Sequence, residues 1–459
     1  MQRSCPILMI AVMVFTAASV SAQSDLLILT SDFATGSMAY LPAGAATAQV
    51  NLLGLHSDAV GYFQDGRIYV VNRLGQDNII LLYPADVATP LTQFSVGNGS
   101  NPRDIEVLAT GKAYVSRYES SDLLIVDPRD GTEIGFIDLS AYADADGLPE
   151  MDQIVRVGDL IYVSCQRLDR NAGFVPGNAV LVIIDILSDT VIGDIALSAA
   201  NPNSVIVVGE RIVVSGSAGF GDRAGGIDIV DTRTASSLGL VITEEQLGGD
   251  LNFLALRTSN AGFAIVLDET FANTIVPVDL ATGSIGAPLE GLSGGFVATV
   301  AIDGNRLLVG DQGSFTDPSS AGLKIYDATT GVLLQGPIDT GLPPNYIVVL
   351  NQAPITAVRE ERSTALPGDT ALGAGFPNPF NATVRVPFEL AADGFVEMHV
   401  YDLLGRRVQT LVAEHLAPGG YSATWDGTDG TGQSVANGAY FLHIPGGGDA
   451  SMSKIMLLK

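Results

Sequence analysis

Short runs of alternating apolar and polar residues, separated by turns, dominate the chain from residue 25 to residue 352. The clearest stretch, residues 112–139, repeats this alternation with a period of two and predicts three short antiparallel strands. A tight turn at residues 128–131 separates the second strand from the third, because Asp bonds the backbone two residues on and Gly adopts positive φ without steric cost. So small a unit cannot bury its own apolar face, so the pattern predicts similar units beside it.

Such units recur at intervals in the forties and fifties, the length of a four-stranded propeller blade. The residues that open the predicted turns are Asp127, Asp185, Asp231, Asp279 and Asp327. Six copies fit between residues 57 and 342. The remaining pieces, 25–55 and 346–350, form a seventh blade if the last strand becomes the innermost strand of the first blade, which removes an open sheet edge. Because the copy around residues 263–280 is poorly formed, a count of six or eight blades is the alternative.

The second strand of several copies carries a recurring Tyr-Val motif. It reads Tyr69-Val70-Val71-Asn72 in one copy and Tyr-Val-Ser at residues 114–116 and 162–164. These copies resemble the YVTN-repeat β-propellers, a broad family of extracytoplasmic seven-bladed proteins. The resemblance implies an all-β fold with a seven-bladed β-propeller over residues 25–352, and it says little about activity.

The pattern stops at residues 353–372, which are mixed, polar and punctuated by Pro, and which we interpret as a linker. Residues 373–459 alternate again, as in Tyr421/Ala423/Trp425, and predict a second, small β-sandwich. Its motifs are FPNPFN at 376–381, YDLLGRRV at 401–408, YSATWDG at 421–427, GAYFL at 438–442 and KIMLLK at 454–459.

These motifs resemble the type A C-terminal sorting domain of the type IX (Por) secretion pathway, whose fold family includes the Ig-like domain of flagellar hook-cap proteins. The resemblance implies that the type IX machinery is a partner and that the protein is delivered to the cell surface or medium. The alternative is an Ig-like accessory domain with no sorting role.

The first 22 residues have the pattern of a signal peptide. Arg3 gives a positive start, residues 7–15 are apolar, and Val20-Ser21-Ala22 forms a small-residue cleavage site. The apolar run is too short to span a bilayer comfortably, so we expect no transmembrane segment in the mature chain and a secreted or cell-surface location. Cys165 is the only cysteine after residue 22, which excludes an intrachain disulfide in the mature chain.

The 459-residue chain is strongly acidic, with 50 Asp and Glu against 23 Lys and Arg and a formal charge of −27. A surface of this sign repels phosphate backbones, so we expect no nucleic-acid partner. His56 is the only histidine before residue 353, so neither a nucleophile–His–acid set nor a His/Cys zinc site can be assembled in the propeller. Binding is therefore favoured over catalysis.

The predicted binding face lies where two sets of loops open together, those that enter each innermost strand and those between the second and third strands. The candidate residues are Asn101, Arg103, Asp104, Arg167, Asn201, Asn203, Arg223 and Asn345. Amide and guanidinium groups on long loops suit an extracellular glycan or protein. Two alternatives stay open: a structural surface-layer role, and an enzyme similar to the calcium-dependent propeller lactonases. The channel residues for such an enzyme would be Asp58, Asp104, Asn203 and Asn252.

One loop also suggests a cation. Asp144, Asp146 and Glu150 cluster around Gly147, and hard cations such as Ca²⁺ prefer oxygen ligands on a flexible loop. The spacing lacks the EF-hand pattern, so a solvated loop is the alternative interpretation. Calcium is the only cofactor that the sequence suggests.

Overall fold

The computed structural model describes residues 23–108, 111–314, 316–350, 371–372, 380, 384–390, 394–403, 405–416, 419–429, 433–445 and 452–458. The predicted signal peptide lies outside the described residues, as do residues 353–370 of the predicted linker. The chain divides into two compact units, Met1–Val358 and Arg359–Lys459. Each unit is described by itself.

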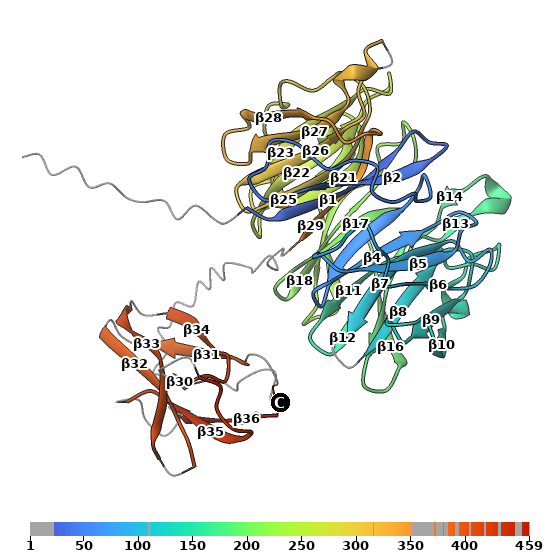
Figure 1. Cartoon of the computed structure of the whole chain (residues 1–459). Coiled ribbons are helices and arrows are strands. Elements are labelled where there is room, and N and C mark those ends of the chain that lie inside the picture. The colour runs from blue at the N-terminus through green and yellow to red at the C-terminus, as the bar shows by residue number, and fades with distance from the viewer. Residues whose placement is uncertain are drawn as a thin grey trace, which may run out of the picture. The chain divides into compact units, whose positions relative to one another are not determined.

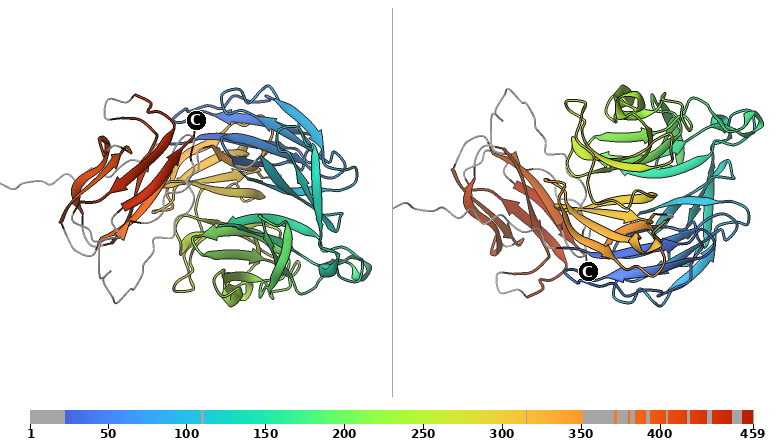
Figure 2. Two further views of the ribbon diagram at one scale, coloured as in Figure 1. Left: turned by 90° about the horizontal axis from the view of Figure 1, so that it is seen from below. Right: turned by 90° about the horizontal axis from the view of Figure 1, so that it is seen from above.

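The first unit is a seven-bladed β-propeller, and the seven-blade count is confirmed (Figures 1 and 2). Each blade is an antiparallel sheet whose innermost strand lines a central channel. Blade 1 consists of β29 (Pro344–Leu350), β1 (Asp25–Ser31) and β2 (Gly36–Leu41). Blade 2 consists of β3 (Val60–Gln64), β4 (Arg67–Asn72), β5 (Asn78–Leu82) and β6 (Thr92–Ser95). Blade 3 consists of β7 (Pro102–Leu108), β8 (Lys112–Arg117), β9 (Asp122–Val126) and β10 (Glu133–Asp138).

The other four blades follow the same order from the channel outward. Blade 4 consists of β11 (Met151–Val157), β12 (Leu160–Cys165), β15 (Val180–Asp185) and β16 (Thr190–Ala196). Blade 5 consists of β17 (Pro202–Val208), β18 (Arg211–Gly216), β19 (Gly226–Asp231) and β20 (Ser236–Thr243). Blade 6 consists of β21 (Asp250–Leu256), β22 (Ala261–Leu267), β23 (Asn273–Asp279) and the two-residue β24 (Ser284–Ile285). Blade 7 consists of β25 (Val297–Asp303), β26 (Arg306–Asp311), β27 (Gly322–Asp327) and β28 (Leu333–Ile338).

Four short elements and a small hairpin decorate the loops. The hairpin of β13 (Leu168–Asp169) and β14 (Val175–Pro176) projects from blade 4 (Figure 1). The helical turns are α1 (Glu244–Leu247), η1 (Ser140–Tyr142), η2 (Arg170–Ala172) and η3 (Pro318–Ser320). None of the helices in the described part of the chain has the length and apolar character needed to cross a membrane.

The ring closes as expected, through the pairing of β29 with β1. Leu27 lies opposite Val348 in this antiparallel ladder. The outer edge of blade 1 is covered by an irregular segment, in which Tyr40 and Gln49 exchange two backbone hydrogen bonds of 2.8 Å. Blade 1 is thus built from both ends of the propeller sequence, and neither edge of β1 stays open.

The turn chemistry expected from the repeat is present in all five copies. Each turn-opening Asp accepts, on Oδ1, the backbone N–H of the residue two positions on. The five distances are 2.9 Å for Asp127, 2.7 Å for Asp185, and 2.9 Å for Asp231, Asp279 and Asp327. These bonds satisfy backbone donors that the strands leave unpaired, which fixes the turn between the third and fourth strands.

The Tyr residues of the Tyr-Val motif are wedges between blades. Tyr69, Tyr114 and Tyr162 are almost completely buried, and each packs against the next blade along the chain. Burial of each tyrosine side chain stabilises the propeller by about 2–3 kcal/mol, because a large apolar surface is removed from water. Cys165 lies with Tyr114 in the core between blades 3 and 4, where burial raises the pKa of its thiol well above the usual value. It therefore packs as a small apolar residue.

The second unit is a small two-sheet sandwich. One sheet contains β30 (Ala371–Leu372), β31 (Val384–Leu390) and β34 (Gly419–Trp425). The other contains β33 (Arg407–Leu416), β32 (Gly394–Tyr401), β35 (Gly438–His443) and β36 (Met452–Leu457). The predicted linker ran to Leu372, whereas the structure places its last two residues in β30. Trp425 is buried at the centre, with the rings of Phe380 and Tyr440 at 5.6 Å and 4.9 Å from its own.

Candidate functional site

The central channel contains a cavity of about 550 Å³ that is lined by all seven innermost strands. Two of its polar residues serve the architecture. Gln64 donates to the carbonyl of Ile105 at 2.9 Å and accepts from the N–H of Val107 at 2.6 Å. Gln153 makes the same pair of bonds to Asn203 and Val205 in blade 5, both at 2.8 Å. Each amide thus bridges two inner strands that have no backbone ladder between them.

Two carboxyl groups of β7 face this channel in an unusual state. Asp104 is buried and accepts the N–H of Ile154 on Oδ2 at 2.8 Å, and burial raises its pKa well above the usual value. Burial also raises the pKa of Glu106 to about 7, although Arg156 opposes that shift. Burial therefore favours the neutral form of both acids, because a charge in this poorly solvated channel is costly.

At the channel mouth, a network of hydrogen bonds joins blades 3, 4 and 5. Arg103 Nε donates to Asp152 Oδ1 at 2.7 Å, and Gln166 Nε2 lies 3.1 Å from the other oxygen of that carboxylate. The same Gln166 nitrogen donates to the carbonyl of Pro202 at 2.8 Å, and Tyr118 donates its hydroxyl to Gln166 Oε1 at 3.1 Å. Asp152 is almost fully buried, so this network is rigid and its members are held in one geometry.

Two guanidinium groups lie over the ring of Tyr118. The Arg103 group is 5.2 Å and the Arg170 group 5.6 Å from its centroid, both within the range of cation–π attraction. Sequence reasoning missed Tyr118, Asp152 and Gln166 as mouth residues. The available signal was the pair Arg117-Tyr118, which follows directly on a Tyr-Val strand and so begins a loop of the predicted face.

The amide residues predicted for this face form hydrogen bonds with neighbouring segments of the propeller. Asn101 is buried; its N–H donates to Asp77 Oδ1 at 3.0 Å, and its Oδ1 accepts from the N–H of Leu74 at 3.3 Å. Asn203 donates to the carbonyl of Leu251 at 2.5 Å, and Asn345 accepts from Gln312 at 3.2 Å. Asn101 and Asn345 thus contact loops between second and third strands, whereas Asn203 connects β17 to the inner strand β21 of the next blade.

The predicted arginines are also engaged within the chain. Arg223 is ion-paired with the buried Asp250 at 2.7 Å, and Arg167 donates to the carbonyl of Asn178 at 3.0 Å. Among the channel acids considered for a lactonase-like metal site, Asp58 is paired with Arg73 at 2.5 Å. Asp104 accepts backbone N–H groups, as described above. Asn201 adopts a left-handed conformation with φ of 43° at the entry to β17.

The predicted cation loop is assembled in the structure. Asp144, Asp146 and Glu150 each place a carboxylate oxygen within 4.8 Å of the others. Glu150 is fully buried, and its Oε1, like Oδ2 of Asp144, has no hydrogen-bond partner. Burial and the two aspartates raise the pKa of Glu150 to about 7. Arg170 lies beside the cluster, its Nε 3.5 Å from Asp146 and 3.4 Å from Glu150, so these oxygens already face one cation.

These oxygens suit a hard cation, because two of them are buried without a donor and the third carboxylate stays ionised. The alternative is that Arg170 alone balances the charge of these carboxylates, so that the loop holds its conformation without a metal ion. The oxygens and Arg170 also tie residues 144–150 to the β13–β14 hairpin, through the bond from the N–H of Arg170 to Asp146 Oδ2 at 3.2 Å.

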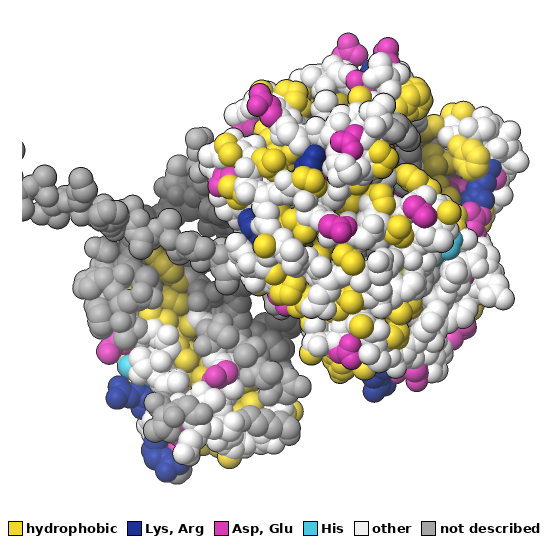
Figure 3. Space-filling view, turned by 45° about the horizontal axis from the view of Figure 1, so that its top comes forward, with side chains coloured by type: hydrophobic (Ala, Val, Ile, Leu, Met, Phe, Trp, Pro, Cys, Tyr) yellow, Lys and Arg dark blue, Asp and Glu magenta, His cyan; other side chains and the backbone are white. Residues whose placement is uncertain are grey.

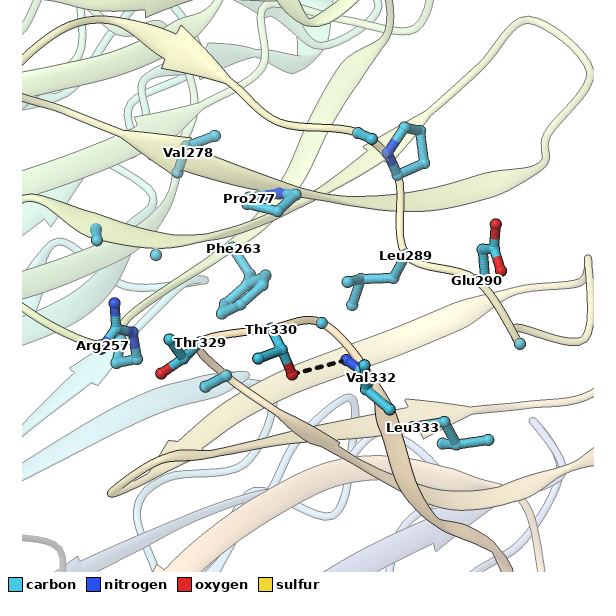
Figure 4. A pocket seen from close by; sticks show the side chains of 17 residues that line it. Arg257, Phe263, Pro277, Val278, Leu289, Glu290, Thr329, Thr330, Val332 and Leu333 are labelled. Carbon is cyan, nitrogen blue, oxygen red and sulfur yellow. Dashed lines mark hydrogen bonds between the residues drawn. The ribbon is translucent and has the colours of Figure 1, made fainter. Parts of the chain in front are cut away.

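A larger hollow of about 780 Å³ lies between blades 6 and 7, where β24 is only two residues long (Figure 4). Phe263, Pro277, Leu289 and Leu333 line it, with the side chains of Arg257 and Glu290 toward its two ends. Its lining comes from β22, β23, the third-to-fourth turn of blade 7 and residues 287–291 of the segment that leads into β25. None of the predicted site residues lies in it.

Comparisons with known proteins bear on the second unit through a family match and give solved structures that are similar at low identity. Residues 379–446 match the FlgD Ig-like domain, which confirms the Ig-like character of the second unit. No curated protein matches the chain. Hydrazine synthase of Kuenenia stuttgartiensis is 15% identical, with 64% of this chain and 90% of that one covered and a TM-score of 0.48.

Two further solved structures are similar at the same level. PorZ, a surface component of the type IX secretion system of Porphyromonas gingivalis, is 15% identical, with 93% of this chain and 64% of that chain covered and a TM-score of 0.46. Apo AztD of Citrobacter koseri is 12% identical, with 88% and 98% covered and a TM-score of 0.41. The sheet topology of the first unit and the family match of residues 379–446 define a β-propeller followed by an Ig-like domain.

Proposed function

We propose that the chain is a binding protein of the cell surface or the extracellular medium, which holds a glycan or an extracellular protein over the channel mouth. The observation that carries this proposal is the Arg103–Tyr118–Arg170 stack, which is fixed by ion pairs to Asp152 and Glu119. An aromatic ring and guanidinium groups on a rigid scaffold bind with little loss of conformational entropy. In the channel below the mouth, the buried carboxyl group of Asp104 already accepts two backbone N–H groups, which suits binding better than turnover.

The test is a screen of the full chain from residue 23 against a glycan array and a panel of extracellular proteins. Any ligand found is measured again with a Tyr118→Ala/Arg167→Ala variant and with an Arg257→Ala variant, which changes the hollow between blades 6 and 7. We expect the first variant to weaken binding by about tenfold or more and the second to leave it unchanged. A ligand that binds the mouth variant as tightly as the parent protein would place the site elsewhere.

We also propose that the second unit addresses the protein to the type IX secretion machinery. Support comes from the motifs at 376–381, 401–408 and 454–459 and from the Ig-like fold that carries them. The test uses a bacterium that has this pathway and compares the full chain with one that lacks residues 373–459. We expect the truncated propeller to accumulate in the periplasm. Surface delivery of both proteins would contradict the assignment.

A further inference from the structure

The loops between second and third strands carry large exposed apolar side chains at their tips. We call Phe33, Leu74, Phe174, Phe220 and Phe271 the apolar crown. They come from blades 1, 2, 4, 5 and 6, and each is more than half exposed to solvent. Blade 3 places Tyr118 in the corresponding loop, where it forms the stack described above. The crown therefore repeats around the channel mouth with the blade period.

Four crown residues sit on backbone that large side chains rarely adopt. The φ angles are 68° at Phe33, 48° at Leu74, 65° at Phe174 and 62° at Phe271. In this left-handed region Gly is free of strain and Asn or Asp is tolerated, whereas a bulky apolar residue is uncommon. Nine other non-glycine residues of the described chain have positive φ, and six of them follow that rule: Asn51, Asp65, Asp77, Asn101, Asp189 and Asn201. The exceptions are Glu150, Arg167 and Ala235, none of which has a purely apolar side chain of the size of Phe or Leu.

Neither turn geometry nor solvation thus accounts for Phe or Leu at these four tips. Asn would relax the backbone and would be better solvated, so the apolar side chains disfavour the free protein on both counts. Strained backbone with exposed apolar groups is characteristic of contact sites, where a partner covers the apolar surface.

The crown belongs to the same face as the channel mouth. Leu74 donates its N–H to Asn101, which enters blade 3 beside Arg103. The rings of Phe220 and Phe271 stack at 4.5 Å with an interplanar angle of 3°, which joins the tips of blades 5 and 6. The crown is therefore a continuation of the proposed binding face beyond its polar mouth.

The charge of these loops indicates what kind of partner fits. Together, the loops between second and third strands contain eight Asp or Glu, four Arg and no Lys. The arginines at the mouth are already matched: Arg73 with Asp58, Arg170 with Glu119 and Arg223 with Asp250. Asp32 and Asp222 lie beside crown residues and are exposed, without an ion pair. Asp and Glu are likewise interspersed with apolar groups on the propeller face visible in Figure 3, where Lys and Arg are few.

We infer that the apolar crown docks a basic, amphipathic polypeptide segment of another protein, and this inference rests on the proposed function of the face. Apolar side chains of the segment cover the crown tips, and its Lys and Arg side chains pair with the loop carboxylates. A second copy of this chain fits poorly, because two molecules of charge −27 repel each other.

The test measures binding of the full chain from residue 23 to a labelled amphipathic peptide of Leu and Lys, by fluorescence anisotropy. The same peptide with Glu in place of Lys is the charge control. We expect the Lys peptide to bind, with an affinity that falls as salt is raised, and the Glu peptide not to bind. Absence of binding by the Lys peptide would overturn the inference, whereas a Tyr118-dependent ligand from the screen above would keep the proposed function.

Variants locate the docking surface. We expect the variant F33N/L74N/F174N/F271N to bind the Lys peptide about tenfold or more weakly. It should stay folded and melt close to the parent, since Asn suits positive φ and this gain offsets the lost contact between Phe271 and Phe220. The matched control L91N/L187N/I192N/L238N removes four exposed apolar side chains from turns and outer strands away from the crown, and should bind like the parent. A second variant, D32N/D222N, should bind a few-fold more weakly with a reduced salt dependence. Equal binding by the crown variant and the parent, or equal loss in crown and control variants, would overturn the inference.

Discussion

Leu27 and Val348 lie opposite each other in the ladder that closes the ring, one from the first strand of the propeller and one from its last. Both are buried in the core between blades 1 and 2. We predict that deletion of residues 345–350 lowers the melting temperature of the propeller by more than about 10 °C, because it exposes an edge of β1 and removes part of this core. Truncation directly after Leu350 is the matched control and should melt like the propeller of the full chain. Thermal denaturation followed by far-ultraviolet circular dichroism separates the two.

Glu106 predicts a pH dependence of stability. Because burial raises the pKa of this carboxyl group from 4.5 to about 7 in the folded chain, the folded state binds the proton more tightly than the unfolded state. The contribution of protonated Glu106 to the free energy of unfolding is therefore fully present below about pH 4.5 and is lost as the pH rises toward 7. We expect E106Q to raise the free energy of unfolding at pH 8 by about 1–3 kcal/mol relative to the parent, and to change it little at pH 4. Urea denaturation at the two pH values measures this, and an equal effect at both would contradict it.

The carboxylate loop predicts an effect of calcium. We expect millimolar Ca²⁺ to raise the melting temperature, and D144N/D146N to abolish that rise. The rise should be larger at pH 8 than at pH 5, because burial raises the pKa of Glu150 to about 7 and a metal ligand must be deprotonated. The same concentration of Mg²⁺ controls for ionic strength. An unchanged melting temperature of the parent at pH 8 would mean that Arg170 alone neutralises the loop.

Trp425 offers an internal probe of the second unit, because it is the only tryptophan of the chain. It is buried, and its indole N–H donates to the carbonyl of Thr428 at 2.8 Å. Since the chain divides into two compact units, we predict separate denaturant transitions for tryptophan fluorescence and for far-ultraviolet circular dichroism, which reports mainly on the propeller. Coincident midpoints in both urea and guanidinium chloride would show one cooperative unit.

Local chemistry explains why much of the fold was predictable. Asp127 and its four counterparts bond the backbone within their own turns, and the Tyr of each Tyr-Val strand is large, apolar and regularly spaced. The closing strand β29 was predictable because the segments at the two ends of the propeller each contain too few strands for a blade. These features depend on residues close in sequence or on the number of strands, so the sequence pattern was sufficient to predict them.

The site was less predictable because its contacts join blades. Arg103 finds Asp152 in the following blade, and Gln166 connects that carboxylate to Pro202 in the blade after it. A local sequence pattern cannot predict these pairs, because the partners are far apart in the sequence. The crown was missed in part for a different reason: the loops that carry Phe33, Leu74 and Phe271 are short and look like ordinary turns. Their exposure and positive φ become visible only when the backbone is known.

The closing strand β29 also sets an order on biosynthesis. A nascent chain grows from its N-terminus, so β1 is made first among the strands, and its inner neighbour is made only after all six other blades. During that interval the apolar strand Leu26–Thr30 has a free edge, and free apolar edges are templates for aggregation. Before the ring closes, we therefore expect protection by a chaperone to be needed most at blade 1, at the edge where β29 finally docks.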